Sequence, residues 1–362
     1  MKVSIIVTIY NTEQYLDKCL QSLIKTGKDI TEIICVDDGS TDKSYSIVRE
    51  YKKKDSRIIG IHKENGGISS ARNKGIQIAS GDFLIFVDGD DYIEPNVLNL
   101  LLDSYRQQLD SEAASTVWCG YIRDDWSGKH EINSIFAKKL YDRKEIMEQF
   151  LPSLLGVSYR KLYAWFTGEG LQTKQEFPSV WRAIYSKKII DENKIVFNEC
   201  VQTGEDVLFN WKYFAYADNI QIDDSKYYHY VWRQGSLTQN TAEHFYTSKK
   251  ELIQYREVLN KQLITVTGDL SEEYQGSLVL SKIQMALALS NCSLRNLFTR
   301  YKMFLDYAKL SQIVSAYKKL QITNAPLKYK APLYLAKKQW NLLLFLGCFL
   351  LSNLNIQIYP EN

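Results

Sequence analysis

Residues 82–91, DFLIFVDGDD, join an apolar run directly to a cluster of three acidic residues. Two further apolar runs precede this stretch, KVSIIVTI at residues 2–9 and EIICV at residues 32–36, and the segments between them contain helical spacing. Near-continuous apolar runs that alternate with helices are typical of a parallel sheet covered on both faces. The first hundred residues therefore predict an α/β fold in which helices sandwich a mostly parallel sheet.

The overall composition is that of an ordinary globular protein. Hydrophobic residues make up 45% and charged residues 24% of the 362 residues, enough for a large domain and a smaller one. A net charge of +3 gives no dominant basic field, so we expect no nucleic-acid partner. The six cysteines form no CxxC pair, which favours thiols in a reducing compartment. Since the chain opens in a strand-like run without a signal-peptide pattern, we expect a cytoplasmic protein.

The alternation of strands and helices weakens after about residue 110, and the pattern is mostly helical from about residue 241. We therefore expect an α/β domain at residues 1–240 and a mainly helical C-terminal region at residues 241–362. Within that region, WNLLLFLGCFLL at residues 340–351 is too short to span a bilayer.

The C-terminal region is also one-sided in charge. No acidic residue occurs between Tyr307 and Pro360, whereas seven lysines do: Lys309, Lys318, Lys319, Lys328, Lys330, Lys337 and Lys338. An anionic membrane surface attracts lysines that lie beside an apolar helix. Two interpretations stay open: peripheral contact with the membrane, or a helix packed on the protein with solvated lysines.

Polar residues follow the strand-like runs, where open α/β sheets bind their ligands. Thr8 lies at the end of the first run and Tyr10 directly follows it; residues 37–42 follow the second run and residues 88–91 the third. No glycine-rich phosphate-binding motif is present, so a bound diphosphate would need a divalent cation held by carboxylates. The acidic cluster at residues 88–91 is suited to that task. The alternative is a surface turn in which one aspartate caps the helix that begins near Pro95.

Four segments taken together, SIIVTIYNTEQYLDKCLQSL, VDDGSTD, NGGISSARNKG and GDFLIFVDGDDYIEP, resemble the family 2 glycosyltransferases with the GT-A fold. They occur in the family's order over about residues 2–96. Further on, TGEDVLFNWKYF and YYHYVWRQGSLT look like acceptor-side motifs of bacterial capsule, exopolysaccharide and cell-wall members. The resemblance covers about two thirds of the chain, and it implies a nucleotide-sugar-binding and catalytic domain at residues 1–240.

The resemblance also implies a nucleotide site. Thr8 and Tyr10 would hold the nucleobase and ribose, and Asp38 would accept a hydrogen bond from a base NH, which commonly means uracil in this family. A carboxylate makes such a contact stronger than a neutral pair would be. Arg72 would reach the nucleotide from the third motif. Its alternative role is a structural salt bridge to one of the crowded aspartates.

Metal binding and catalysis are implied by the same motifs. Asp88 would contact the ribose or the metal, and Asp90 would ligate Mn²⁺ or Mg²⁺, which clamps the diphosphate and stabilises the leaving group. Asp206 would be the general base and Glu205 would orient it or the acceptor; such a base contributes about 10²–10⁴-fold. The alternative is a helix start at which acidic residues favour the helix dipole.

The segment after residue 226 is harder to assign. Arg233 and Ser236 resemble a loop that closes over the diphosphate, where an arginine could make a bidentate phosphate contact. His229 is either a further metal ligand or a strand residue with a hydrogen-bonded ring. Because no second histidine is spaced to join it, we favour the strand residue.

These residues predict an inverting glycosyltransferase, because a base and a metal-bound leaving group on opposite sides of the sugar imply one displacement. We expect a UDP-sugar donor, a carbohydrate acceptor that is a lipid-linked oligosaccharide, and a role in bacterial surface polysaccharide synthesis at the membrane's inner face. Two alternatives stay open. Transfer to a polyprenyl phosphate would need no base, and a non-catalytic sugar-nucleotide-binding protein would need no metal.

Overall fold

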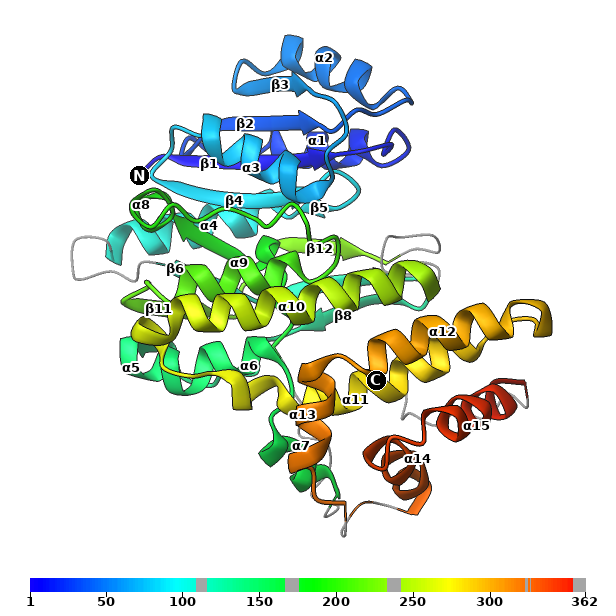
Figure 1. Ribbon diagram of the computed structural model, residues 1–362. Helices are drawn as coiled ribbons and strands as arrows, with labels where there is room; N and C mark the ends of the chain where they lie inside the picture. Colours follow the sequence, from blue (N-terminus) through cyan, green and yellow to red (C-terminus); the bar gives the residue numbers. More distant parts are fainter. Residues whose placement is uncertain (109–115, 167–175, 233–241, 323–324, 326, 354–362) are drawn as a thin grey trace. The chain divides into compact units, whose positions relative to one another are not determined.

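The computed structural model describes residues 1–108, 116–166, 176–232, 242–322, 325 and 327–353 (Figure 1). The chain divides into two compact units. Met1–Leu151 and Glu176–Ser236 form the first unit, and Pro152–Gln175 and Leu237–Asn362 form the second. The domain boundary near residue 240 stays a prediction. It placed residues 152–166 with the N-terminal domain, whereas in the structure they cluster with the C-terminal helices.

An eight-stranded sheet forms the centre of the first unit. Its order is β3 (Ile58–His62), β2 (Ile30–Asp37), β1 (Val3–Ile9), β4 (Phe83–Asp88), β10 (Ala183–Ser186), β6 (Thr116–Cys119), β11 (Asn219–Asp223) and β9 (Leu140–Asp142). The first four strands pair in parallel, and β10 then pairs antiparallel with both β4 and β6. The predicted α/β fold with a mostly parallel sheet is therefore confirmed.

A second sheet has four strands, the first of which directly follows the acidic cluster in the sequence. Its order is β5 (Tyr92–Ile93), β12 (Tyr228–Val231), β7 (Tyr121–Asp125) and β8 (Gly128–Ile132). Strand β5 begins directly after Asp91 and pairs antiparallel with β12. This pairing brings the YYHYV segment to the end of the DFLIFVDGDD segment.

Helices cover both faces of the first sheet. The first unit contains α1 (Leu16–Leu23), α2 (Ser44–Lys54), α3 (Ile68–Ile78), α4 (Pro95–Gln108), α5 (Arg143–Glu145), the π-helical turn η1 (Ile146–Phe150), the 3₁₀ turn η2 (Val180–Arg182), α8 (Lys187–Glu192) and α9 (Glu205–Phe214). Odd-numbered residues of β1 share one core cluster with α1 and α4. On the opposite face α3 packs against β1, where Gly75 lies against Ile6.

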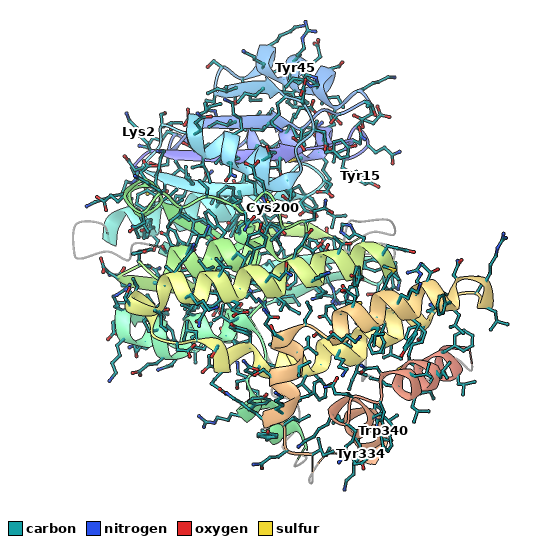
Figure 2. All side chains as sticks on the ribbon, in the orientation of Figure 1. Lys2, Tyr15, Tyr45, Cys200, Tyr334 and Trp340 are labelled. Atoms are coloured by element: carbon teal, nitrogen blue, oxygen red, sulfur yellow. The ribbon has the colours of Figure 1, made fainter. Side chains whose placement is uncertain are left out.

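The second unit is helical throughout its described part, and this confirms the predicted helical C-terminal region. It contains α6 (Leu151–Leu155), α7 (Tyr159–Phe166), α10 (Ala242–Thr267), η4 (Ser271–Tyr274), α11 (Gln275–Ser290), η5 (Leu294–Asn296), α12 (Leu297–Ala308), α13 (Ser311–Lys319), α14 (Leu327–Lys337) and α15 (Asn341–Asn353). The mostly buried α11 contacts α10, α12, α13, α14 and α15. Tyr334 of α14 packs edge to face on Trp340, with ring centroids 6.0 Å apart (Figure 2). Among the described helices, none combines the length and apolarity that crossing a bilayer requires.

We predict that Gly75→Ala destabilises the protein by about 1–3 kcal/mol, because the added methyl group would overlap Cγ2 of buried Ile6. Without such a clash, the same change inside a helix stabilises by about 0.5–1 kcal/mol. Gly347→Ala on α15 is the matched control, since a methyl group there meets no atom within 4 Å. Urea denaturation of both variants measures the difference, and equal midpoints would contradict this account of how α3 packs.

Candidate functional site

The site lies where strands β1, β2 and β4 end. Thr8 is paired with Val36 on one side and with Asp88 on the other. The hydroxyl of Thr8 donates a hydrogen bond to Oδ1 of Asp88 at 3.0 Å. Two of the predicted nucleotide-binding side chains therefore bind each other across neighbouring parallel strands.

Arg72 is the centre of this site. Its side chain is 2% exposed, and its guanidinium contacts Asp206 at 2.7 Å and both Asp88 and Glu205 at 3.1 Å. Burial opposes the charge of Arg72, but the three carboxylates outweigh it and raise the pKa of the guanidinium. The guanidinium also lies over the ring of Phe197, 5.2 Å from its centroid. Arg72 thus makes the salt bridge to a crowded aspartate that its alternative interpretation predicted; its contact with a nucleotide stays a prediction.

Glu205 and Asp206 begin α9, directly after Gly204, whose φ of 91° lies in the left-handed region that favours glycine. Two acidic residues in the first turn of a helix are stabilised by its dipole. The backbone NH of Val180 donates to Oδ2 of Asp206 at 3.2 Å, which fixes the carboxylate from a second side. The helix-start interpretation is correct, and the same turn faces Arg72, so it is compatible with a role in catalysis.

The two carboxyl groups differ in their affinity for a proton. Burial raises the pKa of Glu205 to about 8, and the negative charge of Asp206 adds to that shift. Burial also raises the pKa of Asp206, but Arg72 opposes the shift. A hydrogen bond between the two groups raises the pKa of Glu205 and lowers that of Asp206. Glu205 is therefore the member of the pair that holds a proton more strongly, and Arg72 favours the charged form of Asp206.

Asp91 is a structural member of the acidic cluster. It is buried, and it accepts hydrogen bonds from the hydroxyl of Tyr228 at 2.6 Å and from the backbone NH of Val231 at 2.8 Å. The same Tyr228 oxygen accepts from the backbone NH of Asp88 at 3.1 Å. Burial, with the charge of Asp88, raises the pKa of Asp91. Sequence analysis missed this role of Tyr228, although it lies in the quoted YYHYV motif.

Asp38 holds the loop that precedes α3. Its carboxylate accepts from the backbone NH of Gly67 at 2.7 Å, from that of Gly66 at 3.0 Å and from Nζ of Lys63 at 2.5 Å. Asn65 donates to the backbone oxygen of Asp38 at 2.9 Å. Both oxygens of Asp38 are therefore engaged within the protein, and its contact with a base NH stays a prediction.

Tyr10 is the predicted nucleotide contact that is most accessible. Its side chain is 52% exposed, while the next residue, Asn11, adopts a φ of 50°. The backbone NH of Asn11 donates to Ser40, and its side-chain oxygen accepts from the NH of Thr41 at 2.8 Å. The loop after β1 is thus fixed to the loop after β2, which leaves the Tyr10 ring open to a planar partner.

The residues around Gly89 fit a cation that takes further ligands from a phosphate. No group of three or more His, Cys, Asp or Glu residues in the described part of the chain is placed to hold a metal ion. Mg²⁺, however, is usually bound by one or two carboxylates together with substrate phosphates and water. Asp88 receives the hydrogen bonds from Thr8 and Arg72 on Oδ1 alone, and Asp90 lies partly exposed two residues on. Two carboxylates of this kind match that donor set.

His229 is the last of the predicted residues that the structure describes, and it is not a member of the Arg72 cluster. His229 is buried in β12, where its ring contacts Asp124 at 3.1 Å and Glu94 at 2.9 Å and stacks on Tyr92. The interpretation of His229 as a hydrogen-bonded strand residue is therefore confirmed. Arg233 and Ser236 lie outside the described residues.

The family model and the curated relatives that match this chain are all described as glycosyltransferases. Residues 4–162 match the family described as "Glycosyl transferase family 2". The chain is 33% identical over 239 residues to "Uncharacterized glycosyltransferase EpsJ" of Bacillus subtilis, covering 66% of this chain and 63% of EpsJ. It is 30% identical over 261 residues to the poly(ribitol-phosphate) beta-glucosyltransferase of Bacillus spizizenii, covering 70% of this chain and 36% of that protein. The match thus spans less than two thirds of each of these two relatives.

A solved structure matches almost the whole chain. The crystal structure of S. aureus TarS 1–349 in complex with UDP-GlcNAc superposes with a TM-score of 0.60 at 21% identity, covering 98% of this chain and 92% of that one. At this identity the match is evidence for the fold. Together with the family match and the four ordered motifs, it shows that the chain contains a family 2 glycosyltransferase domain with the GT-A fold.

Proposed function

We propose that the protein is an inverting, metal-dependent glycosyltransferase that moves a hexosyl unit from a UDP-sugar to a carbohydrate acceptor in bacterial surface polysaccharide synthesis. The observation that carries this proposal is the set of contacts made by Arg72. Its guanidinium binds Asp88 at the end of β4, where the diphosphate would lie, and also binds Glu205 and the candidate base Asp206. The TarS complex with UDP-GlcNAc supports a UDP-sugar donor. The beta-glucosyltransferase relative supports transfer that forms a β-linkage.

Asp206 is the proposed general base. It takes the proton of the acceptor hydroxyl as that oxygen bonds to the anomeric carbon and the bond from this carbon to UDP breaks. Glu205 holds a proton more strongly than Asp206, and the contact with Arg72 fixes the Asp206 carboxyl group and favours its charged form, which a general base needs. One displacement of this kind inverts the configuration of the anomeric carbon.

The donor side consists of the residues at the strand ends. Tyr10 would flank the uracil, with Thr8 and Asp38 around the base and ribose, and Asp88 and Asp90 would hold Mn²⁺ or Mg²⁺. The cation would neutralise the diphosphate and stabilise the charge of the leaving group. Arg233 and Ser236 would complete the diphosphate site.

The acceptor is proposed to be a saccharide, such as a lipid-linked oligosaccharide at the inner face of the cell membrane. The helical region at residues 241–362 would then contact the membrane peripherally.

We predict that Asp206→Asn lowers kcat about 10²–10⁴-fold and leaves UDP binding unchanged, because the amide keeps the shape of the side chain but cannot accept a proton. The measurement is UDP release with a panel of UDP-sugars in Mn²⁺, together with calorimetric titration of UDP. Asp218→Asn, at an exposed position on the same unit, is the control and should retain full turnover. Full turnover in Asp206→Asn would rule out Asp206 as the base.

The raised pKa of Glu205 predicts how the free energy of unfolding depends on pH. The folded protein keeps a proton on Glu205 up to a pH of about 8, whereas the unfolded chain releases it near 4.5. The folded state therefore binds more protons across this interval, so Glu205 lowers the free energy of unfolding as the pH rises, by up to about 1.4 kcal/mol per pH unit. We expect Glu205→Gln to remove that part of the dependence in thermal melts at pH 5, 6, 7 and 8. Glu64→Gln, at an exposed loop position, should keep the wild-type dependence; a wild-type slope in Glu205→Gln would refute the assignment.

The metal site is tested by binding rather than by turnover. UDP with Mn²⁺ should stabilise the wild type by about 2.7 kcal/mol at a hundred times the dissociation constant, and chelation should remove most of that gain. We expect Asp90→Asn to lose the Mn²⁺-dependent part of the UDP stabilisation, while Asp218→Asn retains it. Thermal shift assays with and without a chelator measure both effects. Stabilisation by UDP that is indifferent to the cation would argue for a metal-independent site.

A further inference from the structure

The last helix of the second unit leaves one apolar face uncovered. Helix α15 buries Leu344, Phe345 and Cys348 against the unit. Its opposite face, which we call the α15 face, is 37–61% exposed and consists of Leu342, Leu343, Leu346 and Leu350. A helix that is apolar on all sides is typical of a protein interior or of contact with lipid. Four exposed leucines on one face therefore indicate a surface that binds a protein or a membrane.

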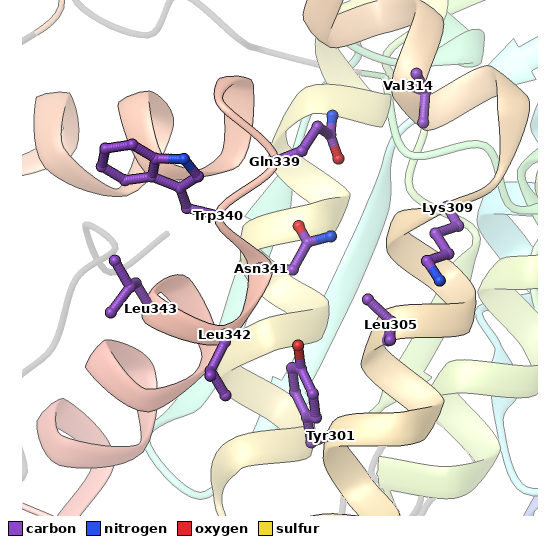
Figure 3. A pocket seen from close by; sticks show the side chains of 9 residues that line it. All are labelled: Tyr301, Leu305, Lys309, Val314, Gln339, Trp340, Asn341, Leu342 and Leu343. Carbon is purple, nitrogen blue, oxygen red and sulfur yellow. The ribbon is translucent and has the colours of Figure 1, made fainter.

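A groove opens beside this face. It has a volume of about 690 Å³, and its apolar wall comes from Leu305 of α12, Val314 of α13 and the start of α15 (Figure 3). Polar side chains also line it, among them Tyr301, Lys309, Gln339 and Asn341. Figure 3 shows the hydroxyl of Tyr301 and the ammonium of Lys309 pointing toward the space between α12 and α15. A pocket with apolar walls and a few polar groups that point inward suits an amphiphilic ligand.

The polar groups of this groove have capacity to bind a ligand. Lys309 is exposed, and within the described part of the chain it forms no ion pair. Asn341 is 8% exposed, and its Oδ1 has no hydrogen-bond partner among the described residues. A buried acceptor without a partner is costly, so it favours a ligand that donates a hydrogen bond. The lysine favours an anionic group on the same ligand.

The charged residues of the chain from Tyr307 to Pro360 have a single sign. The sequence contains no acidic residue from Tyr307 to Pro360. Lys330 on α14 and Lys338 just after it are exposed. Trp340 and Tyr334 are 50% and 43% exposed, and such rings are favoured at the boundary between lipid and water. Lys338, Trp340 and Leu342 therefore place a basic, an aromatic and an aliphatic side chain close together in the sequence around the start of α15.

We propose that the α15 face and its groove bind the surface of an anionic phospholipid bilayer. A lipid headgroup would occupy the groove, with its phosphate at Lys309 and Tyr301 and a headgroup hydroxyl donating to Oδ1 of Asn341. The acyl chains would cover Leu342 and Leu343. Phosphatidylglycerol has this chemistry, since its headgroup carries both a phosphate anion and free hydroxyls. The inference rests on the proposed function, because membrane contact brings the enzyme to a lipid-linked acceptor.

The experiment is sedimentation of the full chain with vesicles of phosphatidylcholine alone or with about 30% phosphatidylglycerol. We expect binding to the anionic vesicles only, weakened by salt. Lys309→Glu should reduce the partition coefficient about 25-fold, since each charge near the surface contributes about fivefold. Leu343→Asp should reduce it at least about tenfold, because it places a charge on the inserted face.

Two controls separate the surface from general charge and apolarity. Lys52→Glu on α2 makes the same charge change at an exposed site, and Ile264→Asp on α10 changes an exposed apolar residue that does not line the groove. Both should bind vesicles nearly as the wild type does. Wild-type binding by Lys309→Glu and Leu343→Asp would overturn the proposal. A different result would also overturn the proposal: light scattering shows a dimer, Leu343→Asp dissociates that dimer, and neither the wild type nor any variant binds vesicles.

The result is independent of the catalytic assignment. Stabilisation by UDP and Mn²⁺ is measured on the same variants, and the groove variants should retain it because their substitutions lie in the other unit. Lost vesicle binding with retained UDP stabilisation supports the lipid surface. Vesicle binding without any UDP stabilisation, even in the wild type, would instead refute the proposed function and leave the lipid surface standing.

Discussion

The structure of the catalytic unit depends on one buried guanidinium among three carboxylates. Arg72 comes from α3, Asp88 from the end of β4, and Glu205 and Asp206 from the start of α9. A buried ion is tolerated only when partners replace its hydration, and arginine can bind several carboxylates at once because its donors form a planar fork. The same contact therefore stabilises the junction of three elements and orients a candidate base. A lysine could not hold all three.

Several residues that look catalytic in the sequence have structural roles that make this contact possible. Asp38 fixes the loop before α3, and Asp91 fixes the end of β4 to β12 through Tyr228. Gly75 lets α3 approach β1 closely enough for Arg72 to reach the strand ends. The acids thus differ in their surroundings: Asp38 and Asp91 bind backbone and side-chain donors of the protein and are buried, whereas Asp88 and Asp90 are partly exposed.

The sequence predicts the part of the fold that local patterns determine. The apolar runs at residues 2–9, 32–36 and 82–87 gave parallel strands, and the polar residues after them meet at one edge. The short strands β10 and β12 were not predictable, because four-residue segments acquire their role from pairing with distant partners. Nor could the pattern DGDD distinguish Asp90 from Asp91, since the difference lies in a hydrogen bond to Tyr228, 137 residues away. The contacts of Arg72 with α9 span a similar distance along the chain.

The balance of charge in the cluster explains why a cation is the fitting partner for a diphosphate here. Arg72 is shared among the carboxyl groups of Asp88, Glu205 and Asp206, and Asp90 follows Asp88 by two residues. A diphosphate that arrived alone would add negative charge to a region where a single guanidinium is already fully shared. Oxygen ligands with an excess of negative charge favour a hard divalent cation, and such a cation would also relieve the repulsion between Asp88 and the incoming phosphates. In the proposed mechanism Arg72 therefore orients the base, and a separate positive group neutralises the charge of the donor.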